Sequence, residues 1–319
     1  MLGFFSRLNW RKSKAHWHLL SQFLRERTID DFAKGDLWQS VLKEAPQKAV
    51  DRFLREGLIA QADLAGLLAY KCKLTDLKDM LRQRGLKVSG RKEDLIARLV
   101  EADPAGAHRA VAGLVVLSCT ETGRALAEQY VAQEQQRRAI AEQAVMSALQ
   151  AGRLEEACRV VNAFEAAQVI PRGIGVDWAT RDVAEDARIL ADIFACRPKI
   201  LANLPEPAWP PLRMAAALAA LWGTNTDRWA PRDLDTGLHL DPGVAARMIL
   251  FWAWQQRDLR SYRASRVVKA VQILTAADSC PACRKVSGKQ YSLGAMPELP
   301  YEKCTSEFGC RCTLTAVIR

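Results

Sequence analysis

Cysteine is concentrated near the C-terminal end of this 319-residue sequence. Five of its nine cysteines lie within 33 residues, and these are Cys280, Cys283, Cys304, Cys310 and Cys312. An odd total argues against a closed set of disulfides. Cys280 and Cys283 offer two thiolates from one turn, and a second pair roughly 20–30 residues later can complete a tetrahedral zinc site. Because no histidine lies nearby, we expect a structural Zn²⁺ held by cysteines alone.

Five thiols compete for four metal positions. Cys280 and Cys283, with Cys310 or Cys312, are the best candidates, and Cys304 can complete the set. Two other interpretations stay open, a redox-active Cys-x-x-Cys pair and a packed tail without metal. No βαβ pattern surrounds the pair, which disfavours redox chemistry. The sequence alone leaves open which four cysteines would bind the metal.

A second group of residues that could do chemistry lies within residues 71–103. Apolar residues at three- and four-residue spacing predict two short helices, with buried faces formed by Leu74, Leu77, Leu81, Leu95, Ile96 and Leu99. Gly85 is placed to end the first helix and Ser89 to cap the second. The second helix begins with free backbone N–H groups beside Arg91 and Lys92, which predicts a phosphate-binding elbow.

This segment resembles the SAP domain, a helix–extended loop–helix module. The resemblance rests on a Leu-x-x-Leu spacing, Arg-Gly-Leu at 84–86, Ser-Gly-Arg-Lys at 89–92 and Leu-x-x-Arg-Leu at 95–99. It implies binding to duplex DNA with weak or no sequence preference. Carried over by position, the expected DNA contacts are Arg84, Lys87, Ser89, Gly90, Arg91 and Lys92. SAP modules also make protein contacts, so protein partners or self-association stay possible alternatives.

Positive charge gathers in the same two regions. The chain carries 46 Lys and Arg against 36 Asp and Glu, a net charge of +10, of which residues 71–101 contribute +4 and residues 257–319 contribute +6. A single module with about four phosphate contacts binds DNA weakly, and its log affinity falls with log salt at a slope of about −3 to −4. Useful affinity would therefore need the basic C-terminal segment, self-association or a partner.

The tail also carries a second resemblance. Residues 271–317 contain Cys-Pro-x-Cys, Gly-Lys-x-Tyr, Pro-x-Leu-Pro and Cys-Arg-Cys, and are similar to the C-terminal end of phage Mu F-type head-morphogenesis proteins. The sequence departs from that pattern where those proteins carry a His-Pro pair, since Tyr301-Glu-Lys-Cys304 stands there instead. The resemblance implies shared zinc-module chemistry. It also suggests an alternative function, a phage or mobile-element assembly protein whose tail mediates protein contacts.

The elements that must position these groups are mainly helical. Helical periodicity and good helix formers run through most of the chain outside the tail. We expect a mainly α, multi-helix protein with an inserted SAP-like unit and a small zinc-bound C-terminal module containing short strands. The expected parts are a helical N-terminal region (1–70), the SAP-like module (71–103), a helical middle domain (104–257) and the basic cysteine-rich module (258–319).

Several familiar activities leave no trace in the sequence. It lacks a Walker P-loop, a Gly-x-Gly-x-x-Gly motif after a strand, a Gly-x-Ser-x-Gly motif and a convincing carboxylate–lysine nuclease signature. No apolar run reaches the length of a membrane span, and basic residues interrupt the N-terminal apolar stretch, so we expect a cytoplasmic protein. The leading interpretation is a non-enzymatic DNA-binding protein of a bacterium or phage. A DNA-processing enzyme with an unrecognised site is the second alternative.

Overall fold

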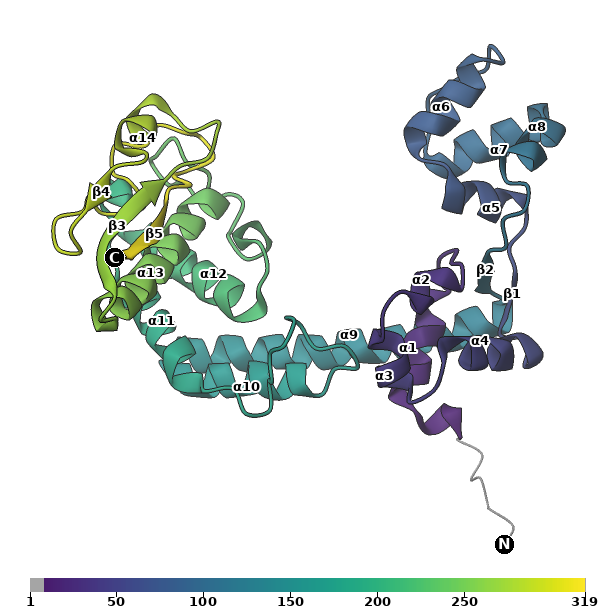
Figure 1. The fold of residues 1–319 in the computed structure, drawn as a ribbon, viewed down its shortest axis with the longest axis horizontal. Coiled ribbons are helices and arrows are strands. Elements are labelled where there is room, and N and C mark those ends of the chain that lie inside the picture. The colour runs from purple at the N-terminus through teal and green to yellow at the C-terminus, as the bar shows by residue number, and fades with distance from the viewer. Residues whose placement is uncertain (1–8, 319) are drawn as a thin grey trace, which may run out of the picture. The chain divides into compact units, whose positions relative to one another are not determined.

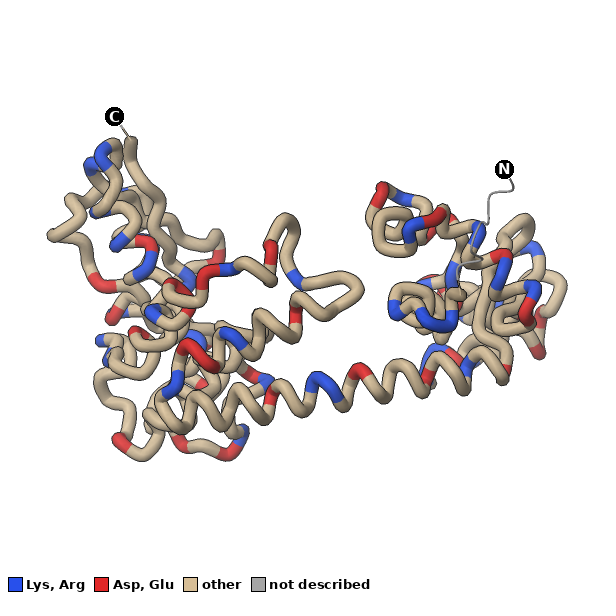
Figure 2. The backbone as a smooth tube through the Cα atoms, turned by 90° about the horizontal axis from the view of Figure 1, so that it is seen from below, with Lys and Arg blue, Asp and Glu red and all other residues tan. Residues whose placement is uncertain are grey.

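The computed structural model describes residues 9–318, so the ends of the first and last expected regions lie outside the described residues. Within that range the chain is mainly helical with a few short strands, which confirms the predicted fold class (Figure 1). It divides into two compact units, Met1–Arg138 with Gln168–Ile170, and Ala139–Ala167 with Pro171–Arg319. The long helix α9 (Glu121–Gln150) contributes its first part to one unit and its last part to the other, and it carries both acidic and basic residues (Figure 2).

The first unit begins with short helices around an aromatic core. After a 3₁₀ turn, its helices are α1 (Lys14–Gln22), α2 (Asp30–Ala33), α3 (Leu37–Leu42) and α4 (Pro46–Arg55). Trp10, Phe23 and Phe53 are buried together in this core. Strand β1 (Ile59–Gln61) then pairs antiparallel with β2 (Leu117–Cys119).

The SAP-like helices are an insertion between these two paired strands. The chain leaves β1, forms α5 (Leu64–Lys71), α6 (Leu74–Arg82), α7 (Lys92–Ala102) and α8 (Pro104–Ala110), and returns to β2. Leucines of α5, α6 and α7 form a separate apolar cluster, to which α8 adds Ala107. The predicted buried residues all belong to it except Leu74, which is 42% exposed because it lies at the very start of α6, beyond the packed face.

The second unit is a helical bundle that continues into the tail. Its helices are α10 (Leu154–Ala166), α11 (Val183–Ala195), α12 (Trp209–Trp222) and α13 (Pro242–Ala264). Alanines of α12 and α13 are fully buried, and such small side chains allow the two helices to pack closely. Helix α13 runs seven residues beyond Arg257, the predicted end of the helical middle domain, because no glycine or proline interrupts the chain there.

The tail forms a small three-stranded antiparallel sheet with one short helix. Its elements are β3 (Val268–Leu274), α14 (Pro281–Val286), β4 (Gln290–Tyr291) and β5 (Thr313–Ile318), in the sheet order β4-β3-β5. Val271, Ile273 and Leu314 are buried in the same core as α13, which confirms the predicted short strands. Among residues 9–318, no helix has both the length and the apolar character needed to cross a bilayer.

Candidate nucleic-acid interface and metal centre

The end of helix α6 sets the direction of the connection to α7. The N–H of Leu86 donates to the carbonyl of Leu81 at 2.9 Å, and the N–H of Gly85 donates to that of Arg82 at 3.0 Å. These two bonds form a Schellman motif, which needs a left-handed residue at its turn. Gly85 supplies it with φ +66°, so the predicted helix end at Gly85 is confirmed.

The start of helix α7 differs from the prediction. Ser89 does not cap it, because the helix begins only at Lys92 and its N-cap residue is Arg91. The carboxylate of Asp94 accepts a hydrogen bond from the Arg91 N–H at 2.8 Å. A phosphate that approaches this helix end would therefore meet the Asp94 carboxylate, which repels it. Attraction of a phosphate then depends on the cationic side chains of the connection between α6 and α7.

The six predicted contact residues fall into two groups. Lys87, Ser89, Gly90 and Arg91 are exposed on the connection, which we call the elbow (residues 87–91). Arg84 and Lys92 are half-buried and form hydrogen bonds within the module. The elbow is therefore open to solvent, as phosphate binding requires.

Arg84 and Lys92 fasten the module to itself. The Arg84 guanidinium donates from Nε to Asp103 at 2.8 Å and from Nη1 to the carbonyl of Met80 at 2.7 Å. The Lys92 ammonium donates to the carbonyl of Ala69, at the end of α5, at 2.6 Å. These two side chains close the helical cluster, so their first role in the structure is to hold the elbow in place.

The two remaining cations of the elbow are free of such partners. No carboxylate of the described residues pairs with Lys87 or Arg91. The carbonyls of Lys87 and Ser89 instead accept hydrogen bonds from the Arg98 guanidinium of α7. Sequence reasoning missed this role of Arg98, although its place in the Leu-x-x-Arg-Leu motif was the available signal. The backbone of the elbow is thus fixed while its charges point to solvent.

The five tail cysteines converge on one place in the second unit. The sulfurs of Cys280 and Cys304 are 3.8 Å apart, and those of Cys283 and Cys310 are 4.0 Å apart. Two groups of three thiols with sulfurs within 4.8 Å share Cys283, namely Cys280, Cys283, Cys304 and Cys283, Cys310, Cys312. A tetrahedral zinc with bonds of about 2.3 Å requires sulfurs about 3.8 Å apart, so the spacing fits.

Local structure explains this convergence. Cys280 is the N-cap residue of α14 and Cys283 lies within that helix, while Cys312 directly precedes β5. The sulfur of Cys310 accepts a hydrogen bond from the Tyr301 N–H at 3.1 Å, and its own N–H donates to Met248 Sδ at 3.2 Å. The last contact joins the segment 304–312, which we call the cysteine loop, to α13.

Burial and the neighbouring groups shift the pKa values of the clustered thiols in opposite directions. Burial opposes ionisation of Cys280, but hydrogen bonds from the backbone of Thr305 and Cys283 outweigh it and lower its pKa to about 6. Burial, followed by the neighbouring Cys310, raises the pKa of Cys283 far above the ordinary value. A buried thiol beside other thiolates ionises only when a positive ion compensates the charge. The donor set is therefore suited to a soft divalent metal such as zinc.

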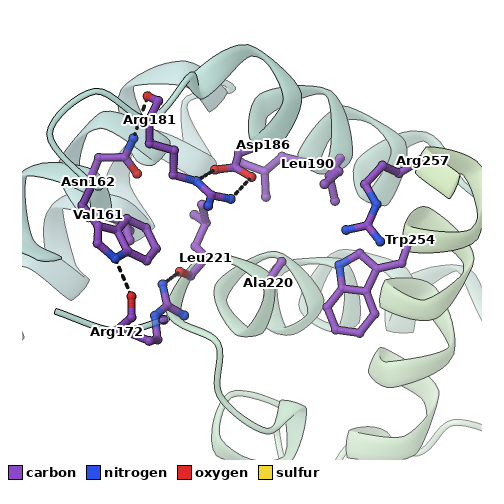
Figure 3. A pocket seen from close by; sticks show the side chains of 13 residues that line it. Val161, Asn162, Arg172, Arg181, Asp186, Leu190, Ala220, Leu221, Trp254 and Arg257 are labelled. Carbon is purple, nitrogen blue, oxygen red and sulfur yellow. Dashed lines mark hydrogen bonds and ion pairs between the residues drawn. The ribbon is translucent and has the colours of Figure 1, made fainter. Parts of the chain in front are cut away.

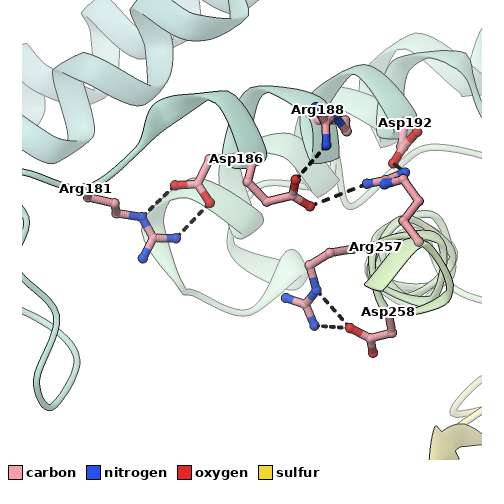
Figure 4. A network of polar contacts seen from close by, with 8 residues as sticks. Arg181, Asp186, Arg188, Asp192, Arg257 and Asp258 are labelled. Atoms are coloured by element: carbon pink, nitrogen blue, oxygen red, sulfur yellow. Dashed lines mark hydrogen bonds and ion pairs between the residues drawn. The ribbon is translucent and has the colours of Figure 1, made fainter. Parts of the chain in front are cut away.

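A cavity of about 300 Å³ in the second unit gathers arginines from several elements (Figure 3). Arg181 binds Asp186 through two bonds of 2.7 Å, and Arg257 pairs with its neighbour Asp258 at 2.6 Å. The network extends along α11 and α13, where Arg260 reaches Asp192 at 2.6 Å (Figure 4). These charges compensate one another, so the network mainly holds the helices together.

No acidic cluster accompanies this cavity in the described part of the chain. There, the tail cysteines alone bring three or more potential metal-ligand atoms within reach of one ion. The arrangement of residues 9–318 therefore offers two candidate sites, the cationic elbow and the cysteine cluster.

Comparison with known proteins bears on the first of these sites. Residues 72–104 match the family model for the SAP domain, which confirms the predicted resemblance and suggests DNA binding. No curated protein and no solved structure matches the chain. The resemblance of the tail to phage Mu F-type head-morphogenesis proteins finds no support in these comparisons. The tail is described by its own geometry, which is compatible with a metal ion.

Proposed function

We propose that this chain is a non-enzymatic DNA-binding protein that grips the phosphate backbone of duplex DNA through the elbow. The observation that carries the proposal is the pair of exposed, unpartnered cations Lys87 and Arg91 within the segment that matches a SAP domain. Gly90, at φ +130°, lets the backbone between them adopt a conformation that residues with a side chain rarely take.

The chemistry of the elbow favours DNA of any sequence. Its charged groups are flexible cations, which attract phosphates and carry little base information. Arg84 and Lys92 are engaged within the module, so the contacts come chiefly from Lys87, Arg91 and the backbone near Ser89. We therefore expect weak binding with a log–log salt slope of about −2 to −4.

The test is a charge reversal at the elbow of the full chain. Lys87→Glu with Arg91→Glu should weaken binding to a duplex at least about tenfold at 0.1 M salt, because two phosphate contacts are lost. Lys34→Glu with Lys48→Glu is the matched control, since both lysines are exposed in the first unit and the net charge changes equally. Fluorescence anisotropy over a salt titration measures both. Equal affinities of the two variants would refute the proposal.

We further propose that the tail binds one structural Zn²⁺ through Cys280, Cys283, Cys304 and Cys310. The pairs Cys280–Cys304 and Cys283–Cys310 share no residue, and each separation, 3.8 and 4.0 Å, is close to one edge of a zinc–thiolate tetrahedron. Cys310 lies outside the triad of Cys280, Cys283 and Cys304, so a bound ion would draw its sulfur toward them. Cys312 is then a buried thiol beside the site. With all four positions taken by protein sulfur, the metal supplies a crosslink between α14 and the cysteine loop.

A further inference from the structure

The hairpin around α14 and β4 carries a second group of exposed cations. Arg284 and Lys285 lie in the last turn of α14, and Lys289 follows in the turn that leads to β4. All three are exposed, and residues 279–297 contain no Asp or Glu. We call these three residues the tail patch.

Two acidic residues of the tail, Asp278 and Glu307, lie at the other end of α14. Asp278 pairs with Arg311 at 2.8 Å, and Glu307 lies with Asp278 and Cys280 around a hollow at the opposite end of α14. No carboxylate of the described residues pairs with Lys285 or Lys289. Exposed lysines without a carboxylate partner attract a polyanion.

The cysteine cluster and the sheet flank the segment that carries the tail patch. On one side, Cys280, the N-cap residue of α14, and Cys283 in its first turn belong to the cysteine cluster. On the other side, the turn is bonded to β3, where the Gly288 N–H donates to the Ile273 carbonyl at 2.8 Å and the Gln272 side chain donates to the Gly288 carbonyl at 2.7 Å. The metal and the sheet would thus hold the patch together.

We propose that the tail patch is a second, metal-dependent contact surface for the phosphate backbone of the same duplex DNA. This inference rests on the proposed function, because it adds a second contact to DNA already held at the elbow. An elbow with few phosphate contacts binds weakly, and a second surface on the same chain acts at a high effective concentration once the first is bound. The patch offers what that second contact needs: Lys285 and Lys289 are exposed and have no carboxylate partner among the described residues, and they stand beside Arg284, whose guanidinium donates to the Ser279 carbonyl at 2.6 Å.

The experiment reverses two charges of the patch in the full chain. Lys285→Glu with Lys289→Glu should weaken duplex binding roughly 10- to 100-fold at 0.1 M salt and reduce the magnitude of the salt slope by about 2. Arg159→Glu with Arg232→Glu is the matched control, since both arginines are exposed in the second unit. Circular dichroism and metal content should match the unaltered protein, which separates lost contacts from lost folding.

Metal removal provides an independent arm of the same experiment. A strong chelator should weaken DNA binding of the unaltered protein, yet change the Lys285→Glu, Lys289→Glu variant much less, because its patch no longer contributes. The inference is overturned if that variant binds like its control, or if chelation leaves the affinity of the unaltered protein unchanged. The elbow variant reports separately on the proposed function. Loss at the elbow without loss at the patch refutes this inference alone, and the reverse pattern refutes the elbow.

Discussion

The SAP-like module and the cysteine-rich tail both present exposed cations, but different forces hold those cations in place. In the module, fully buried leucines of α5, α6 and α7 form a core of their own. Burying one such side chain stabilises a fold by about 1.5–3 kcal/mol. In the tail, α14 is only six residues long, and it places Cys283 and Val286 in the core of the second unit beside the other clustered cysteines.

This difference has a consequence for how each surface can be switched. The module should keep its elbow whenever the chain is folded, because its support is apolar packing. The tail patch should depend on a ligand that can be removed, because the free energy of metal binding adds directly to folding. One chain would thus combine a permanent DNA contact with a conditional one.

The largest expected effect comes from the cysteine that both thiol groups share. Cys283→Ala should abolish metal binding and destabilise the tail more than any other single change, because structural zinc contributes about 10–16 kcal/mol in small zinc-finger peptides. Cys312→Ala is the matched control and should retain one zinc per chain. Elemental analysis and thermal unfolding give the two readouts. Zinc retained by Cys283→Ala would contradict a metal-supported tail, and zinc lost from Cys312→Ala would contradict the proposed ligand set.

The complementary change breaks the apolar support of the elbow. Leu95→Ala removes a fully buried side chain and should destabilise the module by about 2–5 kcal/mol while leaving the zinc content unchanged. Leu74→Ala, at a position that is 42% exposed, should have a much smaller effect and serves as the control. Limited proteolysis between β1 and β2, with zinc analysis alongside, separates the two regions. If Leu95→Ala instead lost its zinc while the module stayed resistant to proteolysis, the contrast between the two regions would be wrong.

The same contrast explains how far sequence reasoning reached. The helices of the module and the turn at Gly85 were predictable, because leucine spacing and a helix-ending glycine act over a few residues. The cysteine cluster was predictable from residue type and density. Both features depend on residues that are close together in the sequence, so they can be recognised without a structure.

What the sequence left hidden depends on partners far along the chain. Arg84 is of a residue type that commonly contacts DNA. Its side chain instead binds Asp103, which lies 19 residues away in sequence. Lys92 likewise donates a hydrogen bond to the carbonyl of Ala69 in α5, a helix that lies almost wholly outside the predicted module. Capping at Ser89 failed because Asp94 offers a carboxylate to the helix start instead. The proposed set of four metal ligands also needed sulfur–sulfur distances, because sequence spacing alone does not distinguish Cys310 from Cys312.

The smallest expected effect tests whether the module also has an electrostatic support. The Gly106 N–H and then the Arg84 guanidinium lower the pKa of Asp103 below its ordinary value of 3.8. A carboxyl whose pKa is lowered by folding adds stability above its unfolded pKa, and this stability is lost as the pH falls through the folded pKa. Asp103→Asn should therefore lower the melting temperature of the module slightly at pH 7, and the difference should vanish well below pH 4. A difference that persists unchanged at low pH would show that Asp103 acts through shape alone, and the module would then rest on apolar packing without help from charge.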